Sequence, residues 1–180
     1  MLRLPPSLLS RKMLCSAYVP APFAETERFR FQAFHAMTVV KVVRRHLKLG
    51  YRLLALEHFE NGARIDISFE TPEGRRRMNE VKSAKNLNEV HFNQAALYWS
   101  PHWDEVAVSN GEKDVILTED QIRRVQHRAE ITRQLLISRP DLAASTFTPN
   151  EAVCGTCVNY QCPFVINRSA VELSNGGLKT

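Results

Sequence analysis

An alternating stretch at 64–83 constrains the fold of this chain more than any other feature. Apolar and polar side chains alternate through 65–70, which is the period-2 pattern of a strand with one buried face. The turn-forming sequence Thr-Pro-Glu-Gly follows at 71–74, and the chain then returns to about 83 as a second strand. Such a hairpin brings three charged side chains to one of its ends: Asp66, Glu80 and Lys82.

The rest of the sequence predicts a mixture of helices and strands. Periodicity and capping residues predict helices at about 8–14, 25–49, 90–99 and 118–138, and strands at 51–59, 105–109 and 115–117. The helix at 25–49 carries an apolar stripe of Ala36, Val40, Val43 and Leu47. Gly50 is its expected stop, Asn61-Gly62 is an expected turn, and the segment after Pro140 is an expected loop. The last helix, capped by Thr118, is expected to face the core with Ile122, Val125, Ala129, Thr132 and Leu136.

Two carboxylates and a lysine at one end of a hairpin suit phosphodiester hydrolysis. Asp66 and Glu80 would hold one or two Mg²⁺ or Mn²⁺ ions, which prefer oxygen ligands and neutralise phosphate. Lys82 would orient or deprotonate the attacking water. Downstream, Gln94 and Tyr98 are four residues apart and so share one helical face. An ordinary surface hairpin with exposed charges would carry the same three residues. By themselves they therefore fit either a hydrolytic site or a solvated hairpin.

The charge balance favours a polyanionic partner, with nucleic acid first. Lys and Arg number 24 against 19 Asp and Glu, a formal net charge of +5. The basic residues cluster at Lys41–Lys48, Arg75–Arg77 and Arg123–Arg128, although solvated helix faces would also explain them. The Arg75–Arg77 turn and the helix with Arg123, Arg124 and Arg128 are candidate phosphate contacts. No apolar run approaches the roughly 18 residues of a membrane span, so we expect no membrane association.

The four cysteines indicate a metal or cluster site. Cys15 stands near the start, and Cys154, Cys157 and Cys162 fall within nine residues near the end. Three thiols so close together are poorly explained as buried core residues in a reducing cytoplasm. Four thiolates suit either Zn²⁺ or a [4Fe-4S] cluster, and the chemistry alone does not choose between them.

The order of these motifs resembles the RecB-like branch of the PD-(D/E)XK nucleases. That order is a histidine, then Asp66, then Glu80-x-Lys82, then Gln94 and Tyr98 on one helix. The resemblance implies that His46, Asp66 and Glu80 bind metal and that Asp66, Glu80, Lys82, Gln94 and Tyr98 are catalytic. His35 and His58 compete with His46 for the histidine position.

The cysteines make the resemblance narrower. One cysteine ahead of the nuclease core and three behind it resemble the iron-sulfur nucleases of the AddB and CRISPR-associated Cas four type. This implies that Cys15, Cys154, Cys157 and Cys162 hold a [4Fe-4S] cluster. It also implies one RecB-like nuclease domain over 1–180, with cluster-binding segments at 1–24 and 140–164 and a tail at 165–180. The implied fold is an α/β PD-(D/E)XK core, a central mixed sheet flanked by helices, followed by the cysteine-rich segment.

The function implied by the resemblance is a Mg²⁺- or Mn²⁺-dependent DNA exonuclease acting on single strands or unpaired ends. Its setting would be CRISPR adaptation or viral or host DNA processing, in the cytoplasm of a prokaryote or in a virus-infected cell, with integrase-type adaptation proteins as partners. A different class also fits: a non-catalytic DNA-end-binding partner of an integrase or replication complex. Residues 1–24 have three basic and no acidic side chains, so a mitochondrial exonuclease is a third reading.

Overall fold

The chain forms two compact units in the computed structural model, which describes residues 4–21, 25–60, 63–159 and 161–164. One unit is Phe23–His127, and the other joins Met1–Pro22 to Arg128–Thr180. The expected turn at Asn61-Gly62 and the expected tail at 165–180 lie outside the described residues. Within the described part, no helix is both long enough and apolar enough to cross a membrane.

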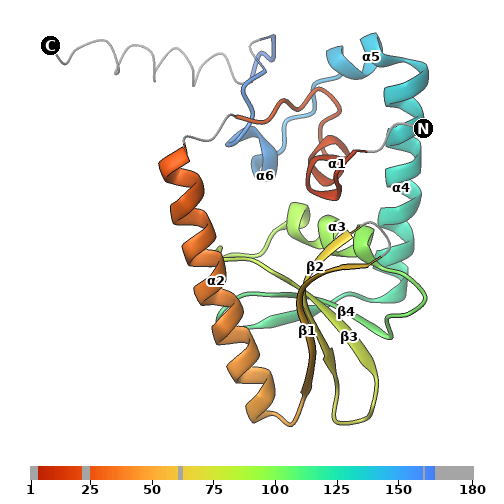
Figure 1. Ribbon diagram of the computed structural model, residues 1–180. Helices are drawn as coiled ribbons and strands as arrows, with labels where there is room; N and C mark the ends of the chain where they lie inside the picture. Colours follow the sequence, from red (N-terminus) through yellow and green to blue (C-terminus); the bar gives the residue numbers. More distant parts are fainter. Residues whose placement is uncertain (1–3, 22–24, 61–62, 160, 165–180) are drawn as a thin grey trace, which may run out of the picture. The chain divides into compact units, whose positions relative to one another are not determined.

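The unit Phe23–His127 is built on a five-stranded mixed sheet (Figure 1). Its strands are β1 (Arg52–Glu60), β2 (Ala63–Glu70), β3 (Arg76–Val81), β4 (Glu105–Ser109) and β5 (Asp114–Ile116), in that spatial order. Neighbouring strands are antiparallel except β3 and β4, which are parallel and connected through helix α3 (Glu89–Tyr98). The expected α/β class with a mixed sheet flanked by helices is confirmed.

Helix α2 (Glu25–Lys48) covers one face of this sheet. Its Val39 and Val42 are buried against Ile67, Phe69 and Val81 of the sheet. The expected stripe was wrong in part, because Val40 and Leu47 are about half exposed. The helix carries adjacent valines at 39–40 and 42–43, which make two apolar stripes, and the sheet packs on the one that also contains buried His46.

Helix α3 and the start of helix α4 (Glu119–Ser138) cover the other face. Met78, Val106 and Val108 of the sheet pack there against Ala95 and Ala96 of α3. Ile122 of α4 and the half-buried Trp99 join the same cluster. The predicted cap of α4 is confirmed: Thr118 Oγ1 accepts from the backbone N–H of Gln121, 3.2 Å away.

Two glycines end elements as the sequence predicted. Gly50 has φ +83° and follows α2, and the next N–H, from Tyr51, donates back to the carbonyl of His46. Gly74 has φ +79° in the turn between β2 and β3, where its N–H donates to the carbonyl of Thr71. Both positions favour glycine because other residues rarely adopt a positive φ.

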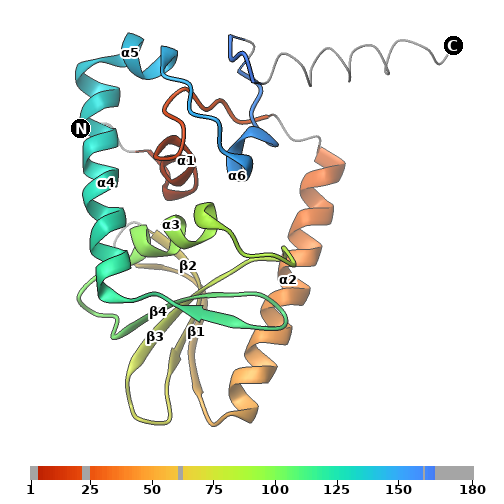
Figure 2. The same ribbon diagram turned by 180° about the vertical axis from the view of Figure 1, so that it is seen from behind.

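The second unit is made of short helices that join the two ends of the chain. Its elements are α1 (Pro6–Lys12), the part of α4 from Arg128 onward, α5 (Pro140–Ser145) and α6 (Glu151–Cys154), and both views show α1 beside α6 (Figures 1 and 2). The expected loop after Pro140 was wrong in part. Pro140 at the first helical position starts α5, and Asn150 caps α6 by accepting from the Ala152 N–H.

Candidate active site

The site begins where β2 and β3 separate. Their pairing runs from Glu70 to Ile67, which lies opposite Asn79, and it stops before Asp66. Beyond that point the Asp66 side chain replaces the strand backbone as acceptor: its Oδ2 accepts a 2.7 Å hydrogen bond from the backbone N–H of Val81. This bond satisfies a strand donor that has lost its backbone partner, and it fixes the carboxylate at the fork.

Glu80 and Lys82 reach the same fork from β3. Glu80 is buried, with 3% of its surface exposed. Lys82 directly follows β3, and its N–H donates to the carbonyl of Ser109 at 2.8 Å, which holds the backbone beside β4. Its Nζ donates to Glu80 Oε1 at 2.6 Å and to Gln94 Oε1 at 2.9 Å.

Helix α3 supplies the remaining polar groups. Gln94 Nε2 donates to the Tyr98 hydroxyl at 3.0 Å, so a continuous chain of polar contacts runs from Glu80 through Lys82 and Gln94 to Tyr98. The amide of Gln94 is thereby oriented, with its oxygen toward the ammonium and its nitrogen toward the phenol. Asn88 fixes the start of α3 by accepting from the backbone N–H of residue 91 at 3.4 Å.

Burial makes Glu80 an unusual carboxylate. Burial is the largest cause, Lys82 opposes it and the charge of Asp66 adds to it, and together they raise the pKa of Glu80 from 4.5 to about 7. Burial together with the nearby Glu80 also raises the pKa of Tyr98 to about 12. Tyr98 is therefore a neutral hydrogen-bonding group at physiological pH and not a base.

The histidine next to the carboxylates is His35, on α2. His35 Nε2 lies 3.4 Å from Asp66 Oδ1, and the hydrogen bond with Asp66 raises the pKa of His35 against the opposing effect of burial. His46 contacts a different carboxylate: its Nε2 lies 3.0 Å from Asp114 Oδ2. The expectation that His46 lies with Asp66 and Glu80 is corrected, because the histidine beside Asp66 is His35.

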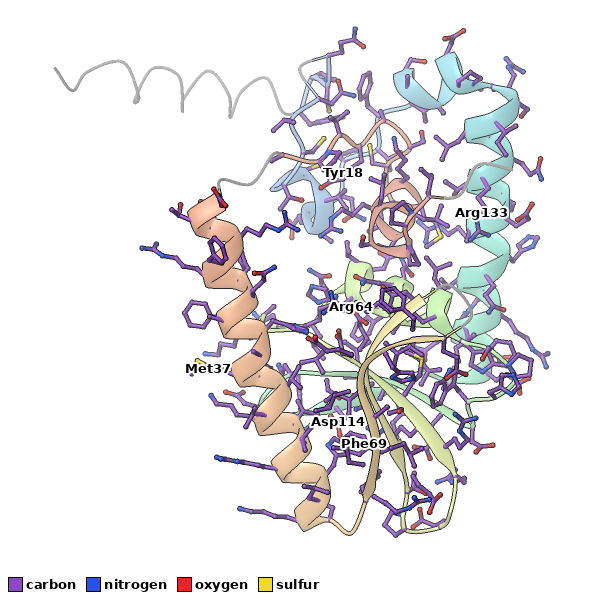
Figure 3. The ribbon with its side chains drawn as sticks, in the orientation of Figure 1. Tyr18, Met37, Arg64, Phe69, Asp114 and Arg133 are labelled. Atoms are coloured by element: carbon purple, nitrogen blue, oxygen red, sulfur yellow. The ribbon has the colours of Figure 1, made fainter. Side chains whose placement is uncertain are left out.

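His46 instead belongs to a buried network between α2 and the sheet, where Figure 3 labels Phe69 and Asp114. The His46 ring stacks on Phe69, with centroids 4.5 Å apart, and its Nδ1 lies 2.8 Å from the carbonyl of Val42. Asp114 is also paired with Arg45 and Arg77. Hydrogen bonds from His46 and from Ser109 outweigh the effect of burial and hold the pKa of Asp114 at about 2.

This network removes one candidate phosphate contact. Arg77 is 3% exposed and its Nη2 lies 3.0 Å from Asp114 Oδ2, so it is corrected to a core residue. Arg75 is paired with Glu105 at 2.6 Å, and the Arg76 guanidinium lies over the Trp103 ring. The pattern of three consecutive arginines could not reveal this, because alternate residues of a strand point to opposite faces.

The cysteine-bearing segments meet in the other unit through backbone pairing. The N–H of Val158 donates to the carbonyl of Val19 at 2.9 Å, and Pro20 and Cys157 form a β-bridge. Backbone N–H groups point at two sulfurs: Val19 N lies 3.5 Å from Cys157 Sγ, and Asn150 N lies 3.4 Å from Cys154 Sγ. Such N–H donors stabilise thiolates, which fits the donor chemistry of a metal or cluster ligand.

Lys12 is a basic group beside the thiols that the sequence did not single out. Its Nζ donates to the carbonyls of Ser16 at 2.9 Å and Tyr18 at 3.0 Å. Burial lowers the pKa of Lys12, and the thiols of Cys15 and Cys157 partly oppose this. Cys15 and Cys162 are buried, whereas Cys154 and Cys157 are half-buried.

Comparison with known proteins gives this geometry no relative: no family model, no curated protein and no solved structure matches the chain. In the part of the chain that the structure describes, no three His, Cys, Asp or Glu side chains are grouped as ligands of one metal ion. The donor chemistry at the fork still suits a divalent cation, because two carboxylates and an imidazole converge where burial makes a second negative charge costly.

Substitution of His46 should lower the free energy of unfolding much more than substitution of His35. His46→Ala should lower the free energy of unfolding by about 2–5 kcal/mol, because it opens a cavity beside Phe69 and leaves Asp114 short of a partner. His35→Ala should change it by less than about 1 kcal/mol, because His35 is half exposed. Chemical denaturation of both variants without divalent ions measures this. Equal losses would contradict the assignment of His46 to the core.

Glu80 predicts a pH-dependent gain in stability for Glu80→Gln. The folded protein binds the Glu80 proton more tightly than the unfolded chain, so ionisation destabilises the fold as pH rises from about 4.5 to about 7. Glutamine can still accept from Lys82 and carries no charge. Without divalent ions, the melting temperature of Glu80→Gln should therefore exceed that of the wild type above pH 7, and the difference should vanish near pH 4. Glu70→Gln, at the other end of β2, is the matched control, and a pH-independent difference would contradict the burial of the Glu80 charge.

Proposed function

We propose that this chain is a metal-dependent DNA nuclease of the PD-(D/E)XK class, RecB-like, which hydrolyses single-stranded DNA or unpaired ends. The observation that carries the proposal is the convergence of Asp66, Glu80 and Lys82 at the fork of β2 and β3. Gln94 contacts the same lysine from α3. A hairpin with incidental surface charges would not bury Glu80 to 3% exposure or hold Lys82 with two oriented partners.

Each residue of the fork has a separate task in this mechanism. Asp66, Glu80 and His35 would hold Mg²⁺ or Mn²⁺, which would neutralise the phosphate and polarise the water that attacks phosphorus. Gln94 orients Lys82 Nζ. Its ammonium would donate a hydrogen bond to the attacking oxygen and would stabilise the negative charge that develops on the phosphoryl oxygens. Tyr98 keeps the Gln94 amide in this orientation.

The four cysteines support a second part of the proposal: a [4Fe-4S] cluster on Cys15, Cys154, Cys157 and Cys162 that ties the two ends of the chain. The pairing of Val19 with Val158 and the N–H groups directed at sulfur favour a thiolate site here. With both parts together, the Cas four type is the closest functional class, acting in CRISPR adaptation or in viral or host DNA processing. Zn²⁺ on the same thiolates is the alternative.

Single substitutions at the fork test the nuclease. Asp66→Ala and Lys82→Ala should each lower the rate of digestion of end-labelled single-stranded DNA by at least about 100-fold, because the groups act on the metal and on the transition state. DNA affinity without divalent ions should change little. Glu70→Ala and Lys85→Ala remove the same charges nearby, outside the fork, and should digest like the wild type. Digestion at the wild-type rate by the Asp66→Ala variant would contradict the proposal. Binding without digestion by the wild type would favour the non-catalytic DNA-end-binding alternative.

Metal content tests the cysteine site. Anaerobically purified protein should be brown and contain about four iron and four sulfide per chain with little zinc. Cys154→Ala and Cys15→Ala should bleach it and lower its melting temperature, because binding in the folded state alone stabilises that state. Gln161→Ala, an exposed change between two of the cysteines, should stay brown. Colourless protein with one zinc per chain would mean that Zn²⁺ occupies this site in place of the cluster. That result would leave the nuclease proposal standing.

A further inference from the structure

Strand β2 carries a cation at the fork that the mechanism above does not use. The pairing of β2 with β3 ends at Ile67, so the part of β2 before this residue pairs with β1 alone. If the same register continued, Asp66 would lie opposite Glu80. Two residues farther out, Arg64 would lie opposite Lys82. The two walls of the fork therefore carry an inner pair of carboxylates and an outer pair of cations, and we call the outer end the mouth of the fork.

Arg64 also lies near the polar contacts of α3. Burial raises the pKa of Tyr98 to about 12, and the positive charge of Arg64 is one of the smaller influences that oppose this rise. A charge has such an influence only over a short distance. Figure 3 labels Arg64 toward the α3 end of the sheet, and Phe69 of the same strand farther from α3. The strand register and the electrostatics thus agree in placing Arg64 beside the fork.

The two outer cations differ in their access to a ligand. Lys82 Nζ already donates to Glu80 and Gln94, and 19% of the Lys82 side chain is exposed. The Arg64 side chain is 57% exposed, and its Nη2 donates to Glu57 Oε2 at 2.8 Å. A guanidinium has five N–H donors in a plane that matches the oxygens of a phosphate. Arg64 is therefore the member of the pair that can receive an anion from solution.

The partner of Arg64 has an unusual backbone conformation. Glu57 faces Asp66 across β1 and β2, because its neighbours along β1 pair with the neighbours of Asp66 along β2. Its φ of +43° is the one positive value among the non-glycine residues that the structure describes. Sparsely populated conformations of this kind are concentrated at positions where a side chain has a task. The contact that the structure shows for the Glu57 carboxylate is the one with Arg64.

We propose that Arg64 binds a phosphate of the DNA strand at the mouth of the fork and exchanges Glu57 for that phosphate. The inference rests on the proposed nuclease and adds a residue to its substrate-binding site. Glu57 occupies the guanidinium while no DNA is bound. An ion pair between two exposed side chains contributes little to stability, so the exchange is not costly. Arg64 holds the substrate before the reaction, whereas Lys82 acts on the charge that develops during it.

A structural ion pair that only joins β1 to β2 is the competing explanation. The chain contains a second pair of this kind: Arg52 of β1 lies 2.5 Å from Glu70 of β2, at the other end of the same two strands. If the pair of Arg64 and Glu57 served only to join the strands, loss of either member would have the same effect. If Arg64 binds phosphate, loss of Arg64 and loss of Glu57 change DNA affinity in opposite directions.

Binding measurements without divalent ions test Arg64 separately from cleavage. The probe is a fluorescein-labelled single strand of mixed sequence, about 20 nucleotides long and so longer than one binding site, followed by anisotropy over a range of salt. Arg64→Ala should weaken binding roughly 10-fold and reduce the salt slope by about 0.7, the value for one lost phosphate contact. Arg64→Lys keeps the charge and therefore the salt slope. It loses the paired donors, so its affinity should lie between those of Arg64→Ala and the wild type.

Two further variants distinguish a phosphate contact from a structural ion pair. Glu57→Gln removes the competing carboxylate and should bind the strand at least as tightly as the wild type. Arg52→Ala, the matched control, breaks the other exposed pair between β1 and β2 and should bind like the wild type.

Three results would overturn the inference. The first is a loss of affinity in Glu57→Gln or in Arg52→Ala equal to that in Arg64→Ala. The second is wild-type affinity in Arg64→Ala, and the third is wild-type protein that does not bind the strand. Melting temperatures equal to that of the wild type exclude unfolding as the cause of a loss.

The outcomes separate this inference from the proposed nuclease. If Asp66→Ala abolishes digestion while Arg64→Ala binds like the wild type, the nuclease stands and the phosphate contact fails. If the wild type digests nothing while Arg64→Ala loses the binding that Arg52→Ala keeps, the contact stands in a DNA-binding protein and the nuclease fails. Where both stand, Arg64→Ala should raise KM for digestion more than it lowers kcat, because Arg64 binds the substrate before the reaction.

Discussion

The hydrogen bond from the Val81 N–H to Asp66 is the contact on which the rest of the site depends. Antiparallel strands that stayed paired would direct Asp66 and Glu80 along the sheet surface with no space between β2 and β3. Ending the pairing at Ile67 exposes backbone donors, and the Asp66 carboxylate satisfies one of them at 2.7 Å. The same bond therefore opens the fork and holds one of its two carboxylates beside the buried Glu80.

The cost of burying charge explains why the fork is surrounded by polar contacts. Burial of the Glu80 carboxylate, to which repulsion from Asp66 adds, raises the pKa of Glu80 to about 7. Lys82 offsets part of it, and its ammonium is in turn satisfied by Gln94. Additional positive charge at the fork would be favourable, and the divalent cation of the proposed mechanism would supply it. The nuclease proposal rests on the convergence of Asp66, Glu80 and Lys82 at this place more than on the order of the motifs.

Much of the fold followed from local sequence signals, whereas the partner of each charged side chain did not. Alternation at 65–70, Gly50 and the Thr118 cap predicted elements that the structure has, because each is a property of a few neighbouring residues. The choice between His35 and His46 is different. The two are eleven residues apart, about three helical turns, so they lie on the same side of α2. Only the position of α2 along the sheet decides which one meets Asp66, and tertiary packing sets that position. Arg77 was misassigned for the same reason, because its partner Asp114 is 37 residues further along the chain.

The buried network around His46 then acquires a role beyond stability. His46 is 0% exposed, stacked on Phe69 and close to Asp114, and it sits near the end of α2. A helix held at such a point can neither rotate nor slide without breaking several buried contacts at once. The rotation of α2 about its own axis is what directs His35 toward Asp66. The network around His46 thus sets the orientation of α2, so a substitution in it that spares the fold would still misplace His35 by rotating the helix that carries it.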